Sequence, residues 1–304
     1  MRNAFSDALV SLALEDPKVL LLTGDHGYAL FDEFRKRCPD RYINAGIAEQ
    51  NMVGMAAGLA RVGFRPFVYG LSAFVPVRVV EQIKLDVAHD KLPVVFVGDG
   101  AGFVYSHLGT SHQSTEDIAC LRAVPDITIL SPSDRHETSA AMRFAYDCRS
   151  SVYLRLGKSD RGDVHNGPVQ LEHGRLLPVG DGAPKQLLFI ATGSLTKTAI
   201  ELSKNYGASV CSAPVIKPLA ALPLAQLLRS FEAVVTFEEH SVLGGLGSAI
   251  AEVASEMTRT PVLRIGVQDR FSHACGSYEY LLREHHLDAS SIEERIRAFL
   301  ASIA

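Results

Sequence analysis

Residues 43–58 read Ile43-Asn44-Ala45-Gly46-Ile47-Ala48-Glu49-Gln50-Asn51-Met52-Val53-Gly54-Met55-Ala56-Ala57-Gly58, which predicts a turn followed by a helix of small side chains. Gly54 and Gly58 are four residues apart and therefore lie on one face of this helix. A glycine inside a helix costs about 1 kcal/mol relative to alanine. Their presence indicates that another backbone approaches closely, and we expect this face to contact a partner.

On both sides of this segment, apolar runs rich in Val and Ile alternate with segments of helical period. The pattern predicts an α/β protein with two doubly wound domains. The expected strands are Val19–Thr23, Pro66–Tyr69, Val94–Gly98, Ile127–Leu130, Val152–Arg155, Gln186–Ala191, Ser209–Ala213, Ala233–Glu238 and Val262–Ile265. The expected helices are Asn3–Leu14, Ala48–Arg61, Val77–His89, Arg135–Cys148, Leu195–Tyr206, Leu224–Ser230, Leu246–Met257 and Ser291–Ser302.

A chain of 304 residues exceeds the usual size of a single domain. Between the two halves the apolar pattern decays into Gly, Asp, Pro and His, with turn signals at Asn166-Gly167-Pro168 and Gly180-Asp181-Gly182-Ala183-Pro184. We therefore predict one domain over residues 1–158, a linker over 159–184 and a smaller second domain over 185–304.

Composition and charge exclude several classes of protein. The net charge is -4, and no run of Lys and Arg is dense enough to follow a nucleic acid. The longest apolar stretches, such as Val94–Val97, are far shorter than a membrane span, and the first residues lack a signal-peptide core. We therefore expect a cytoplasmic protein. The five cysteines form no Cys-x-x-Cys pair, which argues against disulfides and thiolate zinc sites.

Taken alone, Glu49 is an ordinary acid in the first turn of a helix, where the helix dipole favours a carboxylate. The pair His285-His286 and the scattered histidines lack a set of metal-binding partners, and solvated faces explain them, so we assign no metal ligand. A glycine motif, Gly244-Gly245-Leu246-Gly247, follows an expected strand and opens an expected helix, as a dinucleotide-binding motif does. Ile250 stands where the last glycine of that motif belongs, which favours a role in packing or in a subunit contact.

The stretch from Ile43 to Asn51 resembles the pyrimidine-domain signature of transketolase-type enzymes that depend on thiamine diphosphate. Further motifs follow in the order seen in transketolases and deoxyxylulose-phosphate synthases, and the resemblance covers nearly the whole chain. They are Glu81-Gln82-Ile83, Lys91-Leu92-Pro93-Val94, Gly109-Thr110-Ser111-His112-Gln113, Glu116-Asp117, Ser131-Pro132-Ser133-Asp134, Lys217-Pro218-Leu219, Glu238-Glu239-His240, the glycine motif at 244–248 and the segment 264–271.

Full-length members of that family carry an N-terminal domain that binds the diphosphate and its Mg²⁺ through Gly-Asp-Gly followed by Asn. Gly98-Asp99-Gly100 resembles this motif and makes Asp99 a candidate cofactor contact, but no asparagine occurs between Asn51 and Asn166. A turn that ends a strand explains the triplet better. The resemblance therefore implies the C-terminal subunit of a split transketolase, with the diphosphate domain on a separate chain that holds the metal, and a heterotetramer built by self-association.

The resemblance also implies roles for particular residues. Glu49 matches the carboxyl that bonds the pyrimidine ring nitrogen of thiamine diphosphate, and Gln50 beside it is a further candidate cofactor contact. Phe74 would stack on the pyrimidine, although core packing also explains an aromatic residue, and Leu71 and Val77 stand where family members often have further aromatics. His112 matches a histidine that exchanges protons with the substrate's oxygens, so we expect Glu49 and His112 to be catalytic.

Four residues are candidate substrate contacts under the same resemblance. Arg155 and Arg2 would hold a substrate phosphate, although an ordinary ion pair also explains a strand-end arginine. Asp25 would line the same cleft. His107 lies in a stretch where the family often has an acidic residue, and this departure weakens the case for donor recognition and indicates an unusual sugar or keto donor.

The implied reaction is the transfer of a two-carbon ketol unit from a ketose or ketose phosphate to an aldehyde. One alternative keeps the cofactor and decarboxylates a 2-oxo acid, as in deoxyxylulose-phosphate synthases and the beta chains of 2-oxo acid dehydrogenases. Another alternative is a non-catalytic assembly or regulatory module, but the retained Glu49 and His112 count against it.

Overall fold

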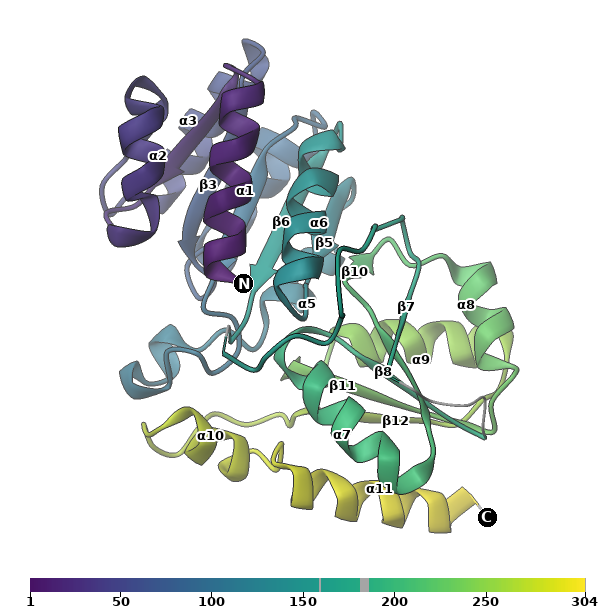
Figure 1. The fold of residues 1–304 in the computed structure, drawn as a ribbon. Helices are drawn as coiled ribbons and strands as arrows, with labels where there is room; N and C mark the ends of the chain where they lie inside the picture. Colours follow the sequence, from purple (N-terminus) through teal and green to yellow (C-terminus); the bar gives the residue numbers. More distant parts are fainter. Residues whose placement is uncertain (159, 181–185, 304) are drawn as a thin grey trace.

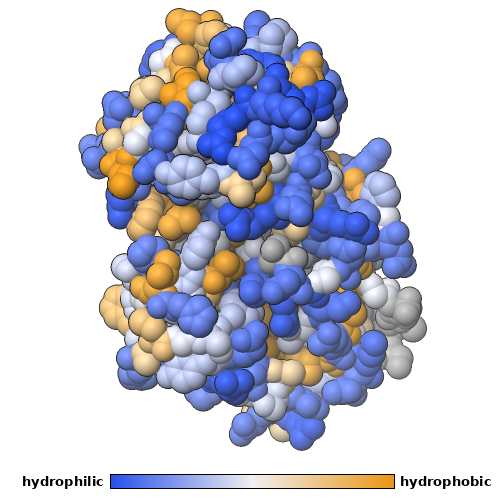
Figure 2. Space-filling view, turned by 60° about the vertical axis from the view of Figure 1, so that its left-hand side comes forward, coloured by the Kyte–Doolittle hydropathy of each residue, from blue (hydrophilic) through white to orange (hydrophobic). Residues whose placement is uncertain are grey.

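The computed structural model describes residues 1–158, 160–180 and 186–303, which form two sheets covered by helices on both faces (Figure 1). The predicted turn residues 181–184 lie outside this range. No helix that the structure describes is long and apolar enough to cross a membrane. On the face in Figure 2, hydrophobic side chains are scattered in small groups among hydrophilic ones.

The first sheet has seven strands in the order β10-β5-β6-β4-β3-β1-β2. Strands β1 to β6 pair in parallel, and β10 (Val215–Lys217) runs antiparallel to β5. The bounds are β1 (Val19–Thr23), β2 (Tyr42–Asn44), β3 (Arg65–Leu71), β4 (Val95–Asp99), β5 (Ile127–Leu130) and β6 (Ser151–Leu156). One face packs against α1 (Arg2–Glu15), α2 (Asp32–Arg37) and α6 (Arg135–Asp147).

The opposite face of this sheet packs against α3 (Glu49–Arg61), the helical turns over 77–88 and α5 (Asp117–Arg122). Strand β1 shows how the sequence produces two cores. Leu21 belongs to the core beneath α1, whereas Leu20 and Leu22 belong to the core beneath α3. Because successive side chains of a strand point to opposite faces, a strand buried on both sides reads as a continuous apolar run.

The second sheet has five strands in the order β12-β11-β8-β9-β7. They are β7 (Leu177–Val179), β8 (Leu187–Ala191), β9 (Ser209–Ser212), β11 (Ala233–Ser241) and β12 (Val262–Val267). Helices α7 (Thr196–Tyr206), α10 (Tyr278–Glu284) and α11 (Ala289–Ile303) cover one face, and α8 (Ala221–Leu228) and α9 (Leu246–Met257) cover the other. Two doubly wound α/β units were predicted, and this prediction is confirmed.

All nine predicted strands exist, and β1 and β5 have the predicted bounds. The sequence analysis missed β2, β7, β10, α2, α5 and α10. The helix predicted over Val77–His89 is instead three short pieces: a 3-10 turn (Val77–Val79), one α turn (Val80–Gln82) and a π-helical segment (Ile83–Ala88). Strand β7 lies inside the segment predicted as a linker.

The strand β10 ties the two halves together, because it follows β9 of the second sheet but pairs with β5 of the first. Side chains reinforce this junction. Ser133 shares buried hydrogen bonds with Thr196 at 2.7 Å and with Ser212 at 3.0 Å. The two units therefore meet through paired backbone and buried polar groups.

Candidate active site

The carboxyl ends of the parallel strands bring the candidate residues to one edge of the first sheet. The chain passes from β1 outward to β2 and then returns to β3 on the other side of β1. Strand order reverses at this point, and ligands of open α/β sheets bind in the crevice outside such a reversal. Asp25 follows β1, Glu49 follows β2, and Phe74 follows β3.

Glu49 is the first residue of α3, and only 6% of it is exposed. Arg78 Nη1 donates a hydrogen bond to Glu49 Oε1 at 2.9 Å, and the Arg78 side chain is 47% exposed. A carboxylate in the first turn is favoured by the free N–H groups and dipole of its helix. Glu49 is thus a buried carboxylate that forms an ion pair with the half-exposed guanidinium of Arg78.

The same arginine connects Glu49 to two other candidates. The guanidinium of Arg78 lies over the Phe74 ring, 4.1 Å from its centroid. The imidazole of His112 packs edge-on against the same Phe74 ring, with ring centroids 5.3 Å apart. Ser111 Oγ lies 2.9 Å from His112 Nδ1. The structure therefore brings Glu49, Phe74 and His112 into one chain of contacts through Arg78.

Arg78 was missed by the sequence analysis. A signal was present, since an arginine four residues after Phe74 in Phe74-Val75-Pro76-Val77-Arg78 can reach back over the aromatic ring. The signal was weak because the segment was predicted as the start of a regular helix. In the structure, residues 77–79 form a 3-10 turn.

Asp25 lies at the end of β1 with a backbone φ of 60°. Its Oδ1 accepts hydrogen bonds from the Tyr28 hydroxyl at 2.6 Å and from Asn44 Nδ2 at 3.2 Å. The Tyr28 bond, followed by the Asn44 bond, lowers the pKa of Asp25 below its ordinary value. Asn44 Oδ1 in turn accepts from the backbone N–H of Asp25 at 3.2 Å and of Gly46 at 2.9 Å, which clamps the turn that leads to Glu49.

Asp99 lies in an internal network of hydrogen bonds and charge. Asp99 is 2% exposed, and its Oδ2 accepts hydrogen bonds from the hydroxyls of Tyr69 and Tyr105, each at 2.8 Å. Arg2 Nη2 lies 3.3 Å from the same oxygen. Burial raises the pKa of both tyrosines, which keeps their hydroxyls protonated as donors. The Asp99 carboxylate thus closes an internal network, while the side chain of Arg2 is 45% exposed. The role of Asp99 as a cofactor contact stays a prediction.

Arg155 is also enclosed by groups of this chain. It is 2% exposed, and its Nε donates to Asp117 Oδ2 at 2.8 Å. Its Nη2 donates to the carbonyl oxygens of Ser114 at 3.2 Å and Glu239 at 2.8 Å. Burial opposes the charge, but Asp117 overcomes this and raises the pKa of Arg155. The guanidinium thus joins the first domain to β11 in the interior. Its contact with a substrate phosphate stays a prediction.

Two further candidates are exposed side chains. Gln50 is exposed on α3, and His107 is exposed on the 3-10 turn Ser106–Leu108. Gly54 and Gly58 are also exposed, with open space where a Cβ would lie. The predicted contact face of α3 is therefore uncovered in the single chain.

Strand β11 carries three buried polar residues, Glu238, Glu239 and His240. Glu238 accepts hydrogen bonds from the backbone N–H groups of Leu246 at 2.7 Å and Gly247 at 2.8 Å, at the start of α9. Burial raises the pKa of Glu238 to about 7, although these two bonds oppose the rise. Burial lowers the pKa of His240 to about 4. The glycine motif at 244–247 therefore serves packing, because a Cβ on Gly245 would come within 2.0 Å of Glu238 Oε2.

Among the described residues, no group of three or more His, Cys, Asp or Glu side chains is arranged to hold a metal ion.

Family models match both parts of the chain. The transketolase pyrimidine-binding domain matches residues 1–162, and the transketolase C-terminal domain matches residues 181–292. A Methanocaldococcus jannaschii protein provisionally named a transketolase C-terminal section is 34% identical, over 97% of this chain and 95% of its own length. The 1-deoxy-D-xylulose-5-phosphate synthase of Chlorobium luteolum is 38% identical over 98% of this chain, which spans 48% of that enzyme.

Solved structures agree with these matches. One described as a split-gene transketolase in an inactive beta4 tetramer is 36% identical, with a TM-score of 0.90 over 99% of this chain and 98% of that one. Transketolase from Leishmania mexicana shares the fold, with a TM-score of 0.76 and 21% identity over 99% of this chain and 45% of that one. The chain belongs to the transketolase family. Within it, the chain is similar to the C-terminal part of a split transketolase, as its motifs predicted.

Proposed function

We propose that this chain is the C-terminal subunit of a thiamine-diphosphate-dependent transketolase whose diphosphate-binding subunit is a separate chain. The observation that carries the proposal is the contact chain of Glu49, Arg78, Phe74 and His112 at the carboxyl edge of a parallel sheet. The reaction is the transfer of a two-carbon ketol unit to an aldehyde. The similarity to a split-gene transketolase supports a separate partner.

The residues present fit the pyrimidine half of the cofactor. A buried carboxyl beside a half-buried aromatic ring suits a flat heterocycle that offers a ring nitrogen. When bound, thiamine diphosphate supplies a carbon nucleophile that cleaves and forms bonds next to a carbonyl. Glu49 would hold a shared proton at the ring nitrogen, and Phe74 would orient the ring by stacking. Arg78 would exchange its contacts with both groups for the cofactor.

His112 is proposed to move protons on the substrate. Because Ser111 engages Nδ1, Nε2 is the nitrogen left to exchange a proton with a substrate hydroxyl. Imidazole can act as acid or base near neutral pH. Arg2 and Asp25, which lie near the ends of α1 and β1, are proposed substrate contacts. Arg2 would have to turn from Asp99 to meet a phosphate.

Magnesium is proposed to be held by the partner, since the carboxylate of Asp99 is occupied by two tyrosine hydroxyls and Arg2. The exposed α3 face at Gly54 and Gly58 is the proposed surface for self-association, in a heterotetramer with two partner chains. The similar split-gene transketolase is described as a beta4 tetramer, which supports association of such chains with one another. The domain bounds 1–158, 159–184 and 185–304 are proposed with it.

A second candidate function is the decarboxylating reaction of 1-deoxy-D-xylulose-5-phosphate synthases. The observation in its favour is the 38% identity to the Chlorobium luteolum enzyme over 98% of this chain. The two reactions differ in the donor, which is a ketose for ketol transfer and pyruvate for the alternative.

One assay separates the two functions. The chain is purified with its partner, thiamine diphosphate and Mg²⁺, and is given an aldehyde acceptor with either a ketose phosphate or pyruvate labelled at its carboxyl carbon. We expect an acceptor lengthened by two carbons from the ketose phosphate and no labelled carbon dioxide. Release of labelled carbon dioxide would favour the alternative, and no reaction with either donor would favour a non-catalytic module.

A further inference from the structure

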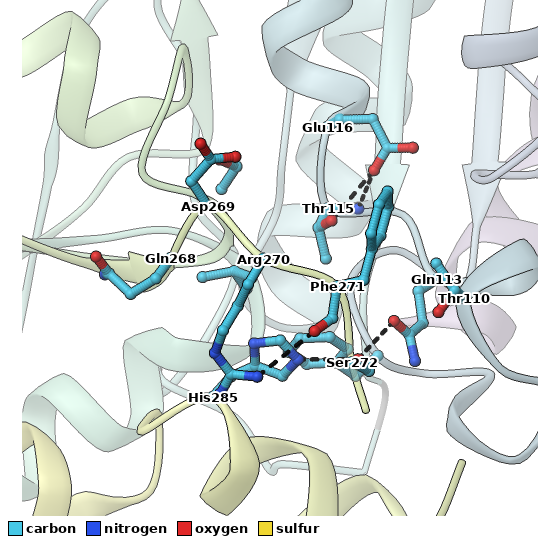
Figure 3. Close-up of a pocket in the computed structure, with 13 residues that line it drawn as sticks. Thr110, Gln113, Thr115, Glu116, Gln268, Asp269, Arg270, Phe271, Ser272 and His285 are labelled. Carbon is cyan, nitrogen blue, oxygen red and sulfur yellow. Dashed lines mark hydrogen bonds between the residues drawn. The ribbon is translucent and has the colours of Figure 1, made fainter. Parts of the chain in front are cut away.

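The loop between β12 and α10 of the second domain contacts the turn of His112 at both of its ends. His112 is the last residue of a 3-10 turn that starts directly after Gly109. A Cβ on Gly109 would lie 2.9 Å from Cys275 Sγ, so loop and turn are in close contact there. At the other end, Ser272 Oγ donates a hydrogen bond to Gln113 Oε1 at 2.8 Å (Figure 3). One loop of the second domain therefore brackets the turn.

The hydroxyl of Ser272 is itself held by His285. His285 Nε2 lies 2.8 Å from Ser272 Oγ. A hydroxyl has one proton to donate, and Gln113 receives it, so Ser272 accepts from His285 Nε2. Burial, followed by the charge of Arg270, lowers the pKa of His285 to about 4, which makes the ring neutral at pH 7. Exchanging the oxygen and nitrogen of the Gln113 amide would reverse the direction of donation and would keep both hydrogen bonds.

His285 is anchored against the first domain. It was expected on a solvated face but is 2% exposed. Its ring stacks on that of the fully buried Phe103, with centroids 4.8 Å apart and an interplanar angle of 23°. The two hydrogen bonds of Ser272 therefore lead from a buried ring to Gln113, the residue directly after His112.

Packing alone does not hold the turn in place. A cavity of about 480 Å³ lies between the two domains and is lined by Thr110 of the turn and by Gln113 directly after it (Figure 3). Ser272 and His285 line the same cavity from the second domain. Because open space adjoins the turn, removal of the hydrogen bond between Ser272 and Gln113 would leave the turn free to shift.

We propose that Ser272, held by His285, is a positioning residue that fixes the orientation of His112 through Gln113. The proposal rests on the proposed function, in which His112 exchanges protons with substrate hydroxyls. Proton transfer requires the two groups within hydrogen-bond reach, and a displacement of about 1 Å can lower the rate about 100-fold. The second domain would thus act on the reaction without contacting the substrate through these residues.

Ser272→Ala in the complex with the partner, thiamine diphosphate and Mg²⁺ tests the proposal. The kcat of ketol transfer should fall about tenfold while KM changes by less than about twofold, because His112 is displaced and the other substrate contacts remain. Ser272→Thr keeps the hydroxyl and should restore most of the kcat. Ser133→Ala is the matched control, because it makes the same change at another buried hydrogen bond between the domains, and it should leave kcat unchanged.

A second measurement does not depend on catalysis. In the full chain with ¹³C-labelled histidines, the ring signal of His112 is identified by its loss in His112→Gln. This ring packs edge-on against Phe74 with centroids 5.3 Å apart, so its chemical shift reports its orientation toward that aromatic ring. Ser272→Ala should move the signal, and Ser133→Ala should leave it in place.

The outcomes are distinguishable. A His112 signal that is the same in folded Ser272→Ala and Ser133→Ala, or an equal kcat of their active complexes, would overturn the proposal. Absence of ketol transfer by the unmodified complex would instead overturn the proposed function, and the His112 signal would then decide whether Ser272 positions the turn. Circular dichroism establishes folding. If Ser272→Ala does not fold, His285→Phe takes its place, because it removes the other partner of the same hydroxyl.

Discussion

Two of the arginine–carboxylate pairs in the structure, Arg78–Glu49 and Arg155–Asp117, differ in how far they are buried. Arg78 binds Glu49 at 2.9 Å, and its side chain is 47% exposed, so the pair opens onto the surface. Arg155 binds Asp117 at 2.8 Å, and both side chains are almost entirely buried. Arg155 also donates to two backbone carbonyls, whereas Arg78 lies over an aromatic ring.

This difference in burial bears on the roles proposed for the two pairs. A pair with an exposed partner can be exchanged for a ligand at low cost, because solvent screens the separated charges. Separating a fully buried pair leaves an uncompensated charge in the interior, which is strongly destabilising. The Glu49 pair is therefore suited to opening for a cofactor, and the Asp117 pair is suited to holding two domains together.

The largest expected effect is on catalysis at the open pair. In the complex with its partner, Glu49→Gln should lower turnover by about 100-fold or more, because the amide cannot carry the shared proton. The steady-state rate of ketol transfer measures this, and native mass spectrometry should find the assembly unchanged. Glu33→Gln, the same change at an exposed residue of α2, serves as the control. Turnover of the Glu49 variant equal to that of the control would contradict its catalytic role.

The next prediction sets the two pairs against each other directly. Arg155→Met should lower the free energy of unfolding by about 3–5 kcal/mol, because it strands the buried Asp117 charge. Arg78→Met should lower it by less than about 1 kcal/mol, because its pair is partly exposed. Urea denaturation of both variants provides the comparison. Equal losses of stability would show that the difference in burial does not separate their roles.

The pH dependence of stability tests the buried groups between the two domains, Glu238 and His240. The pKa of Glu238 is raised to about 7, so its contribution to stability is complete below its ordinary pKa of 4.5 and is lost as the pH rises through 7. The pKa of His240 is lowered to about 4, so its contribution is complete above 6.5 and is lost as the pH falls through 4. Between pH 4.5 and 6.5 the two slopes oppose each other.

Glu238→Gln should remove the opposing effect of Glu238, so that the free energy of unfolding depends on pH through His240. In this variant the free energy of unfolding should fall by up to about 3 kcal/mol more than in the unmodified chain as the pH drops from 6.5 to 4. Denaturant titrations at several pH values measure both curves. Parallel curves for the two chains would show that Glu238 does not titrate in this range.

The smallest effect on stability is expected at the other open feature, the α3 face. Gly58→Leu should leave the folded chain intact, since open space lies above this glycine. The new side chain should weaken self-association by about tenfold or more by blocking close approach of another backbone. Sedimentation velocity measures the change. Gly167→Leu, also in open space, is the control, and equal association of the two variants would place the interface elsewhere.

The fold was predictable from the sequence where a run of apolar residues indicates a buried element. Strand β1 is buried throughout because both of its faces are covered, so the run from Val19 to Leu22 is apolar, and its bounds were predicted from that run. Strands β2, β7 and β10 have three residues each and lie at sheet edges, where pairing with a neighbour defines the strand. No periodicity over three residues can reveal such pairing.

The site was predictable in part for the same reason. Glu49, Phe74 and His112 each follow a strand end or turn, and Arg78 links Glu49 to the Phe74 ring that packs against His112. Their roles in the reaction stay predictions. The environment of Arg155 was not predictable, because its acceptors include the carbonyl of Glu239, 84 residues away in the second domain. Asp99 likewise depends on Tyr69, 30 residues away on the next strand.

The central claim is that this chain completes an active site together with a separate diphosphate-binding subunit. Native mass spectrometry of the tagged chain, co-expressed with its candidate partner in the presence of thiamine diphosphate and Mg²⁺, tests it most directly. The account predicts a heteromer that contains both chains and carries the cofactor. A complex of this chain alone, without cofactor and in the presence of a soluble partner, would contradict it.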